Sequence, residues 1–158
     1  MCKARHNSAE RGQATVEYAL VVPLIFLLVF GLVDFGRLFF TELTLQYALR
    51  AAARYAVTGN HLPNPANPSQ FLTRVASIEQ VAQRYAMGIN VSGLQISSRS
   101  GGVPGSGAGM PGDTVTLSLT HQLVLMTPII GQFFPSGAYT FTVSTSFKNE
   151  PFPPSQRN

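Results

Sequence analysis

The chain lacks the residues and motifs of most enzyme active sites. It has one cysteine, Cys2, so no disulfide can form within the chain. The three histidines, His6, His61 and His121, have no other metal-ligating residue at ligand spacing, and the motifs HExxH and GxSxG and a phosphate-binding loop are absent. His121 falls in the inward register of a predicted strand, so we expect it to pack in the domain. The sequence predicts no enzyme, no metal site and no cofactor.

Charged residues are also missing from a long segment near the N-terminus. Residues Tyr18–Val33 form an uncharged run of 16, and Gln13–Val33 gives 21 residues. At about 1.5 Å rise per residue this length crosses a hydrocarbon core roughly 30 Å thick. Residues 1–11 carry three basic side chains against one acidic, so we expect this flank to stay in the cytoplasm while the larger remainder crosses.

A retained anchor suits this segment better than a cleaved secretory signal. The apolar region of a secretory signal is usually about 7 to 15 residues long and ends in a small-x-small cleavage site. Here the apolar run leads into Asp34-Phe35-Gly36-Arg37. We therefore expect a cytoplasmic leader over residues 1–12 and a transmembrane helix over residues 13–37.

One acidic residue, Glu17, lies inside the predicted anchor. A carboxylate deep in a bilayer costs about 2.5 to 3.5 kcal/mol and normally has a partner. Two interpretations are open. Glu17 could lie at the headgroup level near the helix start, where a negative charge suits the helix dipole, or it could pair with a charge on another chain.

The residues around Glu17 resemble the processing site of type IV prepilins: a basic stretch, then Gly12, four residues, and Glu17-Tyr18 before an apolar helix. The resemblance implies that a membrane-embedded prepilin peptidase cuts between Gly12 and Gln13. Glu17 would then be the fifth residue of the mature chain. The new α-amino group could neutralise Glu17 of a neighbouring subunit, and such a buried pair would select the register between helices.

The wider pattern is similar to the TadE-like family, small pseudopilins of the tight-adherence (Flp pilus) machinery. The shared features are the Glu-Tyr pair, a proline in mid-membrane, the Asp-Phe-Gly-Arg box and a later alanine-rich stretch: Glu17, Tyr18, Pro23, Asp34, Phe35, Gly36, Arg37 and Ala51–Ala56. The similarity is strong over Gly12–Tyr55 and weak over Pro63–Gly112.

Membership of this family implies a set of partners and a location. The partners would be prepilin peptidase, other Tad pseudopilins and pilin subunits, the inner-membrane Tad assembly platform and the lipid bilayer. The chain would cross the bacterial inner membrane once, with a periplasmic C-terminal domain. Loss of residues 1–12, with three basic residues and one acidic residue, would lower the formal charge from +4 to +2, which does not indicate nucleic-acid binding.

Two other functions remain open from the sequence. The chain could be a signal-anchored periplasmic binding module that is never cleaved. It could also be an anchored hydrolase, which the lack of catalytic motifs disfavours. Within the anchor, Pro23 predicts a kink that is either a harmless bend or a packing feature. Asp34 and Arg37 are three residues apart and share a helix face, so they could form a solvated pair at the outer membrane boundary or a specific subunit contact.

The helical pattern continues beyond Arg37 and predicts one helix from Ala14 to Thr58, roughly 65 Å long, whose outer part over residues 38–60 projects from the membrane. Three prolines among residues 61–68 predict an extended connector. A second helix should follow, with Ser69 as its N-cap and an apolar stripe that is more simply a packing face than a binding groove: Phe71, Val75, Ile78, Ala82, Tyr85 and Ile89.

The remaining residues predict strands. Apolar and polar residues alternate over Thr114–Met126 and again over Tyr139–Phe147, and a first strand should begin near Val91. Residues 100–112 are rich in glycine and poor in apolar residues, so we expect a flexible loop there. The predicted fold is α+β: a long N-terminal helix leading into a small pilin-like periplasmic domain over residues 61–158, with a second helix and a three-stranded antiparallel sheet.

Overall fold

The computed structural model describes residues 8–153, with side chains for residues 12–67 and 69–153. Most of the predicted leader, including Cys2 and His6, lies outside the described residues. The chain divides into two compact units. The anchor unit comprises the residues up to Arg37 together with Val124–Tyr139, and the sheet unit comprises Leu38–Leu123 and the residues from Thr140 onward.

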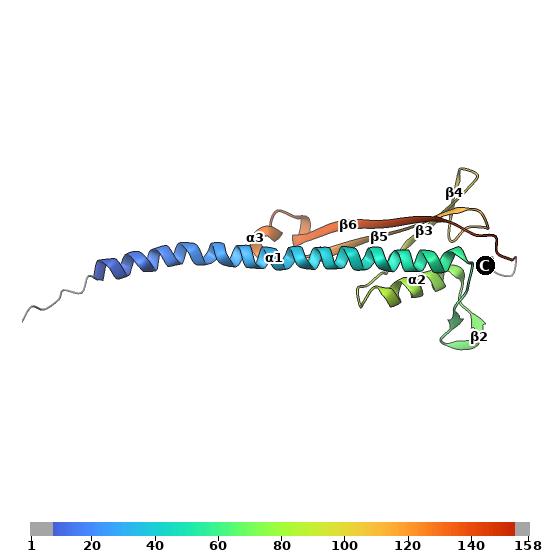
Figure 1. Ribbon diagram of the computed structural model, residues 1–158, viewed down its shortest axis with the longest axis horizontal. Coiled ribbons are helices and arrows are strands. Elements are labelled where there is room, and N and C mark those ends of the chain that lie inside the picture. The colour runs from blue at the N-terminus through green and yellow to red at the C-terminus, as the bar shows by residue number, and fades with distance from the viewer. Residues whose placement is uncertain (1–7, 154–158) are drawn as a thin grey trace, which may run out of the picture. The chain divides into compact units, whose positions relative to one another are not determined.

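Helix α1 spans Ser8–Val57 (Figure 1), and its C-terminal end lies one residue from the predicted end. Gly59 follows with a φ of 71°, a left-handed conformation that glycine adopts without strain. A Cβ at this position would lie 2.6 Å from the ring of Phe152. The helix begins six residues before the predicted Ala14, so Gly12 lies within it.

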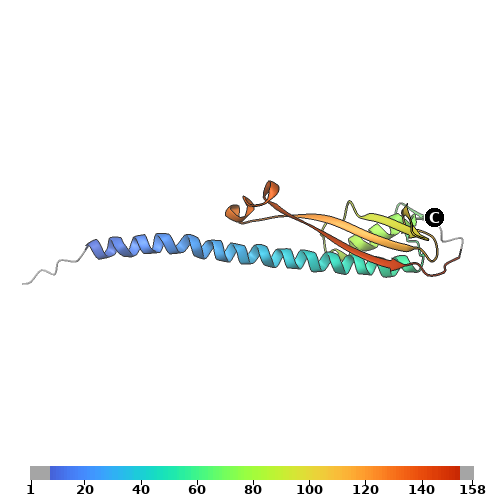
Figure 2. The ribbon, with the colours of Figure 1, turned by 90° about the horizontal axis from the view of Figure 1, so that it is seen from above.

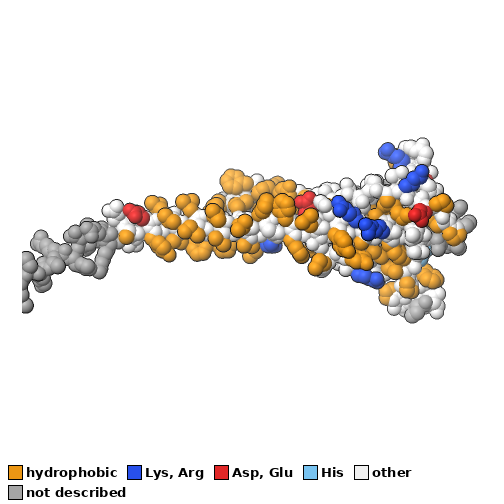
Figure 3. All heavy atoms as spheres, in the orientation of Figure 1, with side chains coloured by type: hydrophobic (Ala, Val, Ile, Leu, Met, Phe, Trp, Pro, Cys, Tyr) orange, Lys and Arg blue, Asp and Glu red, His pale blue; other side chains and the backbone are white. Residues whose placement is uncertain are grey.

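The part of α1 in the anchor unit is apolar and exposed. Most of its large apolar side chains between Val16 and Val33 are exposed, and Figure 3 shows apolar side chains spread over the visible face of this part of α1. The helix continues through Pro23. Among the described residues, α1 is the one helix long and apolar enough to cross a membrane, and none of its most apolar stretch is buried. These properties fit a single-pass membrane anchor.

The rest of the anchor unit is the segment Val124–Tyr139, which we term the connector because it joins strands β5 and β6. It contains the short helix α3 (Pro128–Gly131) and the single 3₁₀ turn η1 (Pro135–Gly137). Pro128 stands at the first turn of α3, where its missing N–H removes no helical hydrogen bond. The connector is closed at its base by a hydrogen bond from Leu125 N–H to Gly137 O at 3.1 Å.

The core of the sheet unit lies between three elements. One face of α1 packs against helix α2 (Arg74–Tyr85) and against the inner face of a sheet, and Figures 1 and 2 show α2 alongside the C-terminal part of α1. Most residues on this face of α1 are almost fully buried. The central core residues are Leu45, Leu49, Ala52, Ala56, Ile78, Ala82, Val115, Leu117, Leu119 and Val143.

The sheet has four strands in the order β4-β3-β5-β6: β3 (Gln95–Ser100), β4 (Val103–Ser106), β5 (Thr114–Val124) and β6 (Ala138–Lys148). β3 pairs antiparallel with β4 and with β5. On the outer face, Thr116 bonds Ser146 at 2.8 Å and Thr120 bonds Thr142 at 2.9 Å. Four steps forward on β5 match four steps back on β6, so this pair is also antiparallel. The two predicted alternating strands are confirmed.

The predicted flexible loop over residues 100–112 is wrong in part, because Val103–Ser106 form the fourth strand, β4. Gly101 and Gly102 have φ values of 55° and 93° and make a two-residue hairpin turn that pairs Ser100 with Val103. β4 is exposed along its whole length. Because β4 is an edge strand with no buried face, its low apolar content is compatible with a strand.

The prediction for residues 61–68 holds in part: the segment is not helical and is extended over Pro63–Asn64 and from Asn67, but its strands are paired. The predicted N-cap Ser69 is wrong. Residues Pro63–Asn64 (β1) pair with Asn67–Phe71 (β2) in a second, two-stranded sheet. The turn is stabilised locally, since Asn64 Oδ1 accepts from Ala66 N–H at 2.9 Å. α2 therefore starts later, with Thr73 as its N-cap and Thr73 Oγ1 accepting from Ala76 N–H at 3.2 Å.

His121 lies on the inward register of β5, as predicted, with its ring centroid 5.8 Å from that of Phe141. Burial lowers the pKa of His121 below its ordinary value of 6.5. The unfolded chain therefore binds more protons than the folded chain as the pH falls below about 6.5, so protonation of His121 destabilises the fold there.

We expect His121→Phe to flatten the loss of thermal stability between pH 7 and pH 5, measured by circular dichroism of the detergent-solubilised chain.

Gln122→Ala, on the outer face of the same strand, is the matched control and should keep the wild-type pH dependence. An unchanged pH slope in His121→Phe would show that other groups cause the acid sensitivity.

Candidate functional site

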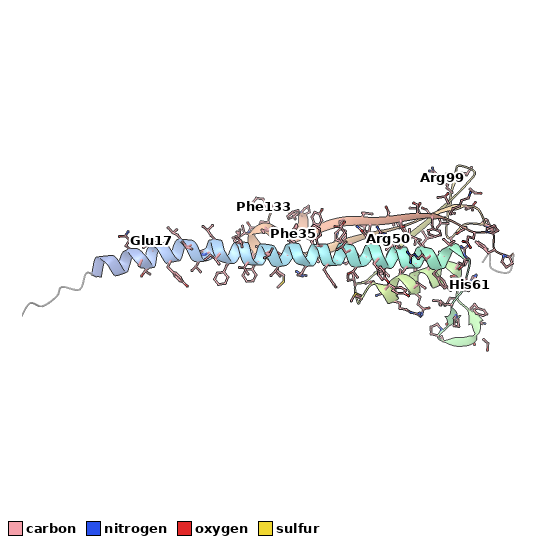
Figure 4. The ribbon with its side chains drawn as sticks, in the orientation of Figure 1. Glu17, Phe35, Arg50, His61, Arg99 and Phe133 are labelled. Atoms are coloured by element: carbon pink, nitrogen blue, oxygen red, sulfur yellow. The ribbon has the colours of Figure 1, made fainter. Side chains whose placement is uncertain are left out.

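Glu17 and Gln13 lie on one exposed face near the start of α1 (Figure 4 labels Glu17). Gln13 Nε2 donates to Glu17 Oε1 at 3.2 Å, a contact between residues one helical turn apart. Within the described side chains no cation forms an ion pair with Glu17. Tyr18, the next residue, is 71% exposed. The described chain thus gives this carboxylate a neutral partner only.

Gly12, the predicted residue before the cleavage point, lies in an open stretch of α1. A Cβ built at this position would meet no heavy atom within 4 Å. Glycine in a helix interior costs about 0.5–1 kcal/mol relative to alanine, so it weakens the helix locally. Gly12 itself is exposed. Pro23 is exposed inside the helix, and its kink stays a prediction.

Asp34 binds the connector. Its side chain is buried, with 5% exposed. Oδ1 accepts from Met126 N–H at 2.8 Å, and Oδ2 accepts from Thr127 N–H at 2.8 Å and from Thr127 Oγ1 at 2.7 Å. Both backbone donors lie immediately before α3, so one carboxylate satisfies two N–H groups that the short helix cannot. We term this arrangement the Asp34 clamp.

Two further residues on the same face of α1 complete the clamp. Arg37 Nη1 lies 3.3 Å from Asp34 Oδ1 and donates to Val124 O at 3.3 Å. Gly31 faces Ile130 of α3, whose Cδ1 would lie 3.3 Å from a Cβ at Gly31. Glycine therefore allows the connector to approach the helix closely, while Asp34 and Arg37 fix its polar groups.

The predicted pairing of Asp34 with Arg37 is confirmed, but the interpretation of a solvated boundary pair is wrong for Asp34. Its carboxylate is buried by its own chain and bonded to a segment more than 90 residues away. The other two members of the Asp-Phe-Gly-Arg box, Phe35 and Gly36, are exposed. Phe35 is 57% exposed, and a Cβ at Gly36 would meet no atom within 4 Å.

A second buried charge, Arg74, ties the sheet unit together and was not identified from the sequence. Arg74 is 3% exposed. Its Nη1 donates to Gly109 O at 2.8 Å, and its Nη2 donates to Ala56 O at 3.1 Å. The guanidinium group also lies 4.5 Å from the centre of the Phe152 ring. Asn149 Nδ2 also donates to Ala108 O at 2.9 Å. These bonds hold the glycine-rich segment after β4. Burial lowers the pKa of Arg74 from its ordinary value.

Sequence reasoning also missed Thr127. The dipeptide Thr127-Pro128 carries a usable signal, because threonine before proline is a common start of a helix. The partner of Thr127 could not be inferred, since Asp34 is distant in sequence. Among the side chains of residues 12–67 and 69–153, no group of three or more His, Cys, Asp or Glu lies close enough together to hold a metal ion.

Comparison with known proteins bears on the N-terminal region. The family model described as TadE-like protein matches residues 12–54, and this confirms the resemblance over those residues. The matched range contains Gly12, Glu17, Pro23 and the Asp34-to-Arg37 box. No curated protein and no solved structure matches the chain.

The Asp34 clamp predicts a local effect of losing one charge. Asp34→Asn keeps the side-chain size but cannot accept all three hydrogen bonds, and a buried donor left unpaired costs about 1–3 kcal/mol. We expect hydrogen exchange at Met126 and Thr127 to become roughly 10- to 100-fold faster, since about 1.4 kcal/mol corresponds to a factor of ten. Exchange followed by mass spectrometry on the detergent-solubilised full chain measures this.

Glu42→Gln removes the same charge from α1 within the sheet unit, where Glu42 accepts from Gln46 Nε2 at 3.2 Å. It should leave exchange in the connector at the wild-type rate. Equal rates in Asp34→Asn and Glu42→Gln would contradict the clamp.

Proposed function

From the TadE-like match over residues 12–54, we propose that the chain is a minor pseudopilin of the tight-adherence (Tad) pilus, processed by prepilin peptidase. A TadE-like N-terminal region implies a function associated with this pilus. The finer role is supported by Glu17, an exposed carboxylate in an apolar helix with no cationic partner in the described chain. An acid of this kind in a membrane segment normally serves a function.

Cleavage after Gly12 supplies the missing cation. It removes the basic leader and frees the α-amino group of Gln13, which carries a positive charge at neutral pH. The bond from Gln13 Nε2 uses one acceptor position of the Glu17 carboxylate and leaves others for a charged donor. Pairing of one subunit's α-amino group with the next subunit's Glu17 would remove two costly charges from the membrane together and fix the register of the two helices.

The other parts of the chain fit an assembly role. The apolar surface of α1 can contact lipid while the chain is in the membrane. After the chain is extracted into a pilus, the same surface can contact the helices of other subunits. The sheet unit, placed in the periplasm, would contact other pseudopilins. The partners on this account are prepilin peptidase, the pilin subunits and the inner-membrane assembly platform.

One observation favours a second candidate, an uncleaved signal-anchored interaction module. Gly12 lies inside a continuous helix that begins at Ser8, so the proposed cleavage site is helical in the free chain. A peptidase would need to unwind this end before cutting. The weak helix propensity of Gly12 lowers the cost of that step.

Substitution at the cleavage site separates the two candidates. In cells with an active prepilin peptidase, we expect Gly12→Ala to leave the membrane-extracted chain at full length, because the peptidase would lack the glycine it recognises. Gly36→Ala is the matched control: it makes the same change in the same helix, where a Cβ meets no atom within 4 Å. Intact mass should show a chain starting at Gln13 for the control. Identical masses for the two variants would exclude processing after Gly12.

A second substitution tests the docking role of Glu17. Glu17→Gln removes the charge but keeps the hydrogen-bonding shape, so we expect normal cleavage and a several-fold loss of crosslinking to pilin or pseudopilin subunits in the membrane. Glu42→Gln, at an acid that also accepts from a glutamine one turn away, should crosslink normally. Undiminished crosslinking of Glu17→Gln would rule out charge pairing as the docking contact.

A further inference from the structure

The connector is an uncharged segment with exposed apolar side chains. No Asp, Glu, Lys, Arg or His occurs in Val124–Tyr139. Met126, Ile129 and Phe133 are 58%, 54% and 83% exposed. Such side chains at the tip of a strand connection are unusual, since connecting segments that face water are normally polar. Their exposure calls for a contact outside the described chain.

The Asp34 clamp fixes the height of this segment along the anchor. Ile130 packs on Gly31, and Met126 and Thr127 bond to Asp34. If the membrane segment starts at Gln13, then Gly31 and Asp34 lie about 27 and 31 Å further along the helix axis at 1.5 Å per residue. A hydrocarbon core is about 30 Å thick. The clamp thus holds the connector at the outer edge of the apolar layer.

The backbone of the connector suits a site of low polarity. Its turns are closed by its own hydrogen bonds: Gly131 N–H to Thr127 O at 2.9 Å, and Phe133 N–H to Ile130 O and Gly137 N–H to Phe134 O, both at 3.1 Å. The N–H groups of Met126 and Thr127 are bonded to Asp34. Irregular backbone exposed to lipid does not occur within the hydrocarbon core, so the connector suits the boundary of the bilayer, where these internal bonds leave fewer polar groups to hydrate.

We propose that the connector is a second membrane contact, in which Met126, Ile129 and Phe133 enter the outer leaflet beside α1 (Figure 4 labels Phe133). The partner is the acyl-chain and headgroup boundary of the bilayer. The contact is continuous with the proposed anchor, and the absence of charged side chains removes the cost of dehydrating them. It rests on the membrane insertion of α1, but not on cleavage after Gly12.

The chain has no tryptophan, so a single introduced tryptophan reports on its own position. The test uses Phe133→Trp in the full chain, reconstituted into phosphatidylcholine vesicles with lipids brominated near the headgroup end of the acyl chains. Phe26→Trp, at a 54% exposed site in the apolar part of α1, is the membrane reference. Phe71→Trp, at a 73% exposed site on β2, is the reference for water.

We expect brominated lipid to quench Phe133→Trp and its emission to be blue-shifted relative to Phe71→Trp, which should stay unquenched. Ile129→Trp should behave as Phe133→Trp does. Unquenched emission from Phe133→Trp with Phe26→Trp quenched would overturn the second contact alone. A blue shift without quenching would assign the surface to a protein partner, such as a second copy, and overturn lipid contact. Unquenched Phe26→Trp would overturn the anchor and the connector proposal together.

Discussion

The hydrogen bonds from the connector to the Asp34 carboxylate are the interaction on which the anchor unit depends. A carboxylate with 5% of its side chain exposed is costly unless its oxygens are bonded, and here two backbone N–H groups, one hydroxyl and Arg37 bond it. In return, Asp34 satisfies the donors before α3, a helix of four residues that cannot stabilise itself. Within the Asp-Phe-Gly-Arg box, Asp34 and Arg37 therefore act first in the fold of their own chain.

The two acids of the apolar part of α1 have different environments. Asp34 is buried and bonded by its own chain, whereas Glu17 is exposed and accepts from the neutral side chain of Gln13. Within the described side chains, Asp34 thus has a cationic partner in Arg37 and Glu17 has none. This difference is the physical reason to assign Asp34 to the fold and to propose Glu17 for contact with another subunit. A family resemblance alone does not separate the two.

Local patterns predicted much of the fold, and distant contacts account for what they missed. The end of α1 at Val57 follows from the glycine two residues later, and the strands β5 and β6 follow from alternation; both signals belong to single segments. β4 and the β1–β2 pair each depend on a partner strand, which a local pattern does not identify. For β4, the Gly101-Gly102 pair is a sequence signal for a hairpin turn. The candidate site shows the same limit. The pairing of Asp34 with Arg37 follows from their spacing on the helix, and the docking role of Glu17 stays a prediction, but Thr127 and Arg74 act through residues far away in sequence.

The N-terminus of the mature protein tests the central claim most directly. Untagged protein should be extracted from membranes of cells with an active prepilin peptidase, and its intact mass and N-terminal sequence measured together. The account predicts a chain that begins at Gln13, with Glu17 as its fifth residue. A chain that still begins at Met1 would contradict the pseudopilin assignment and leave a membrane-anchored interaction module.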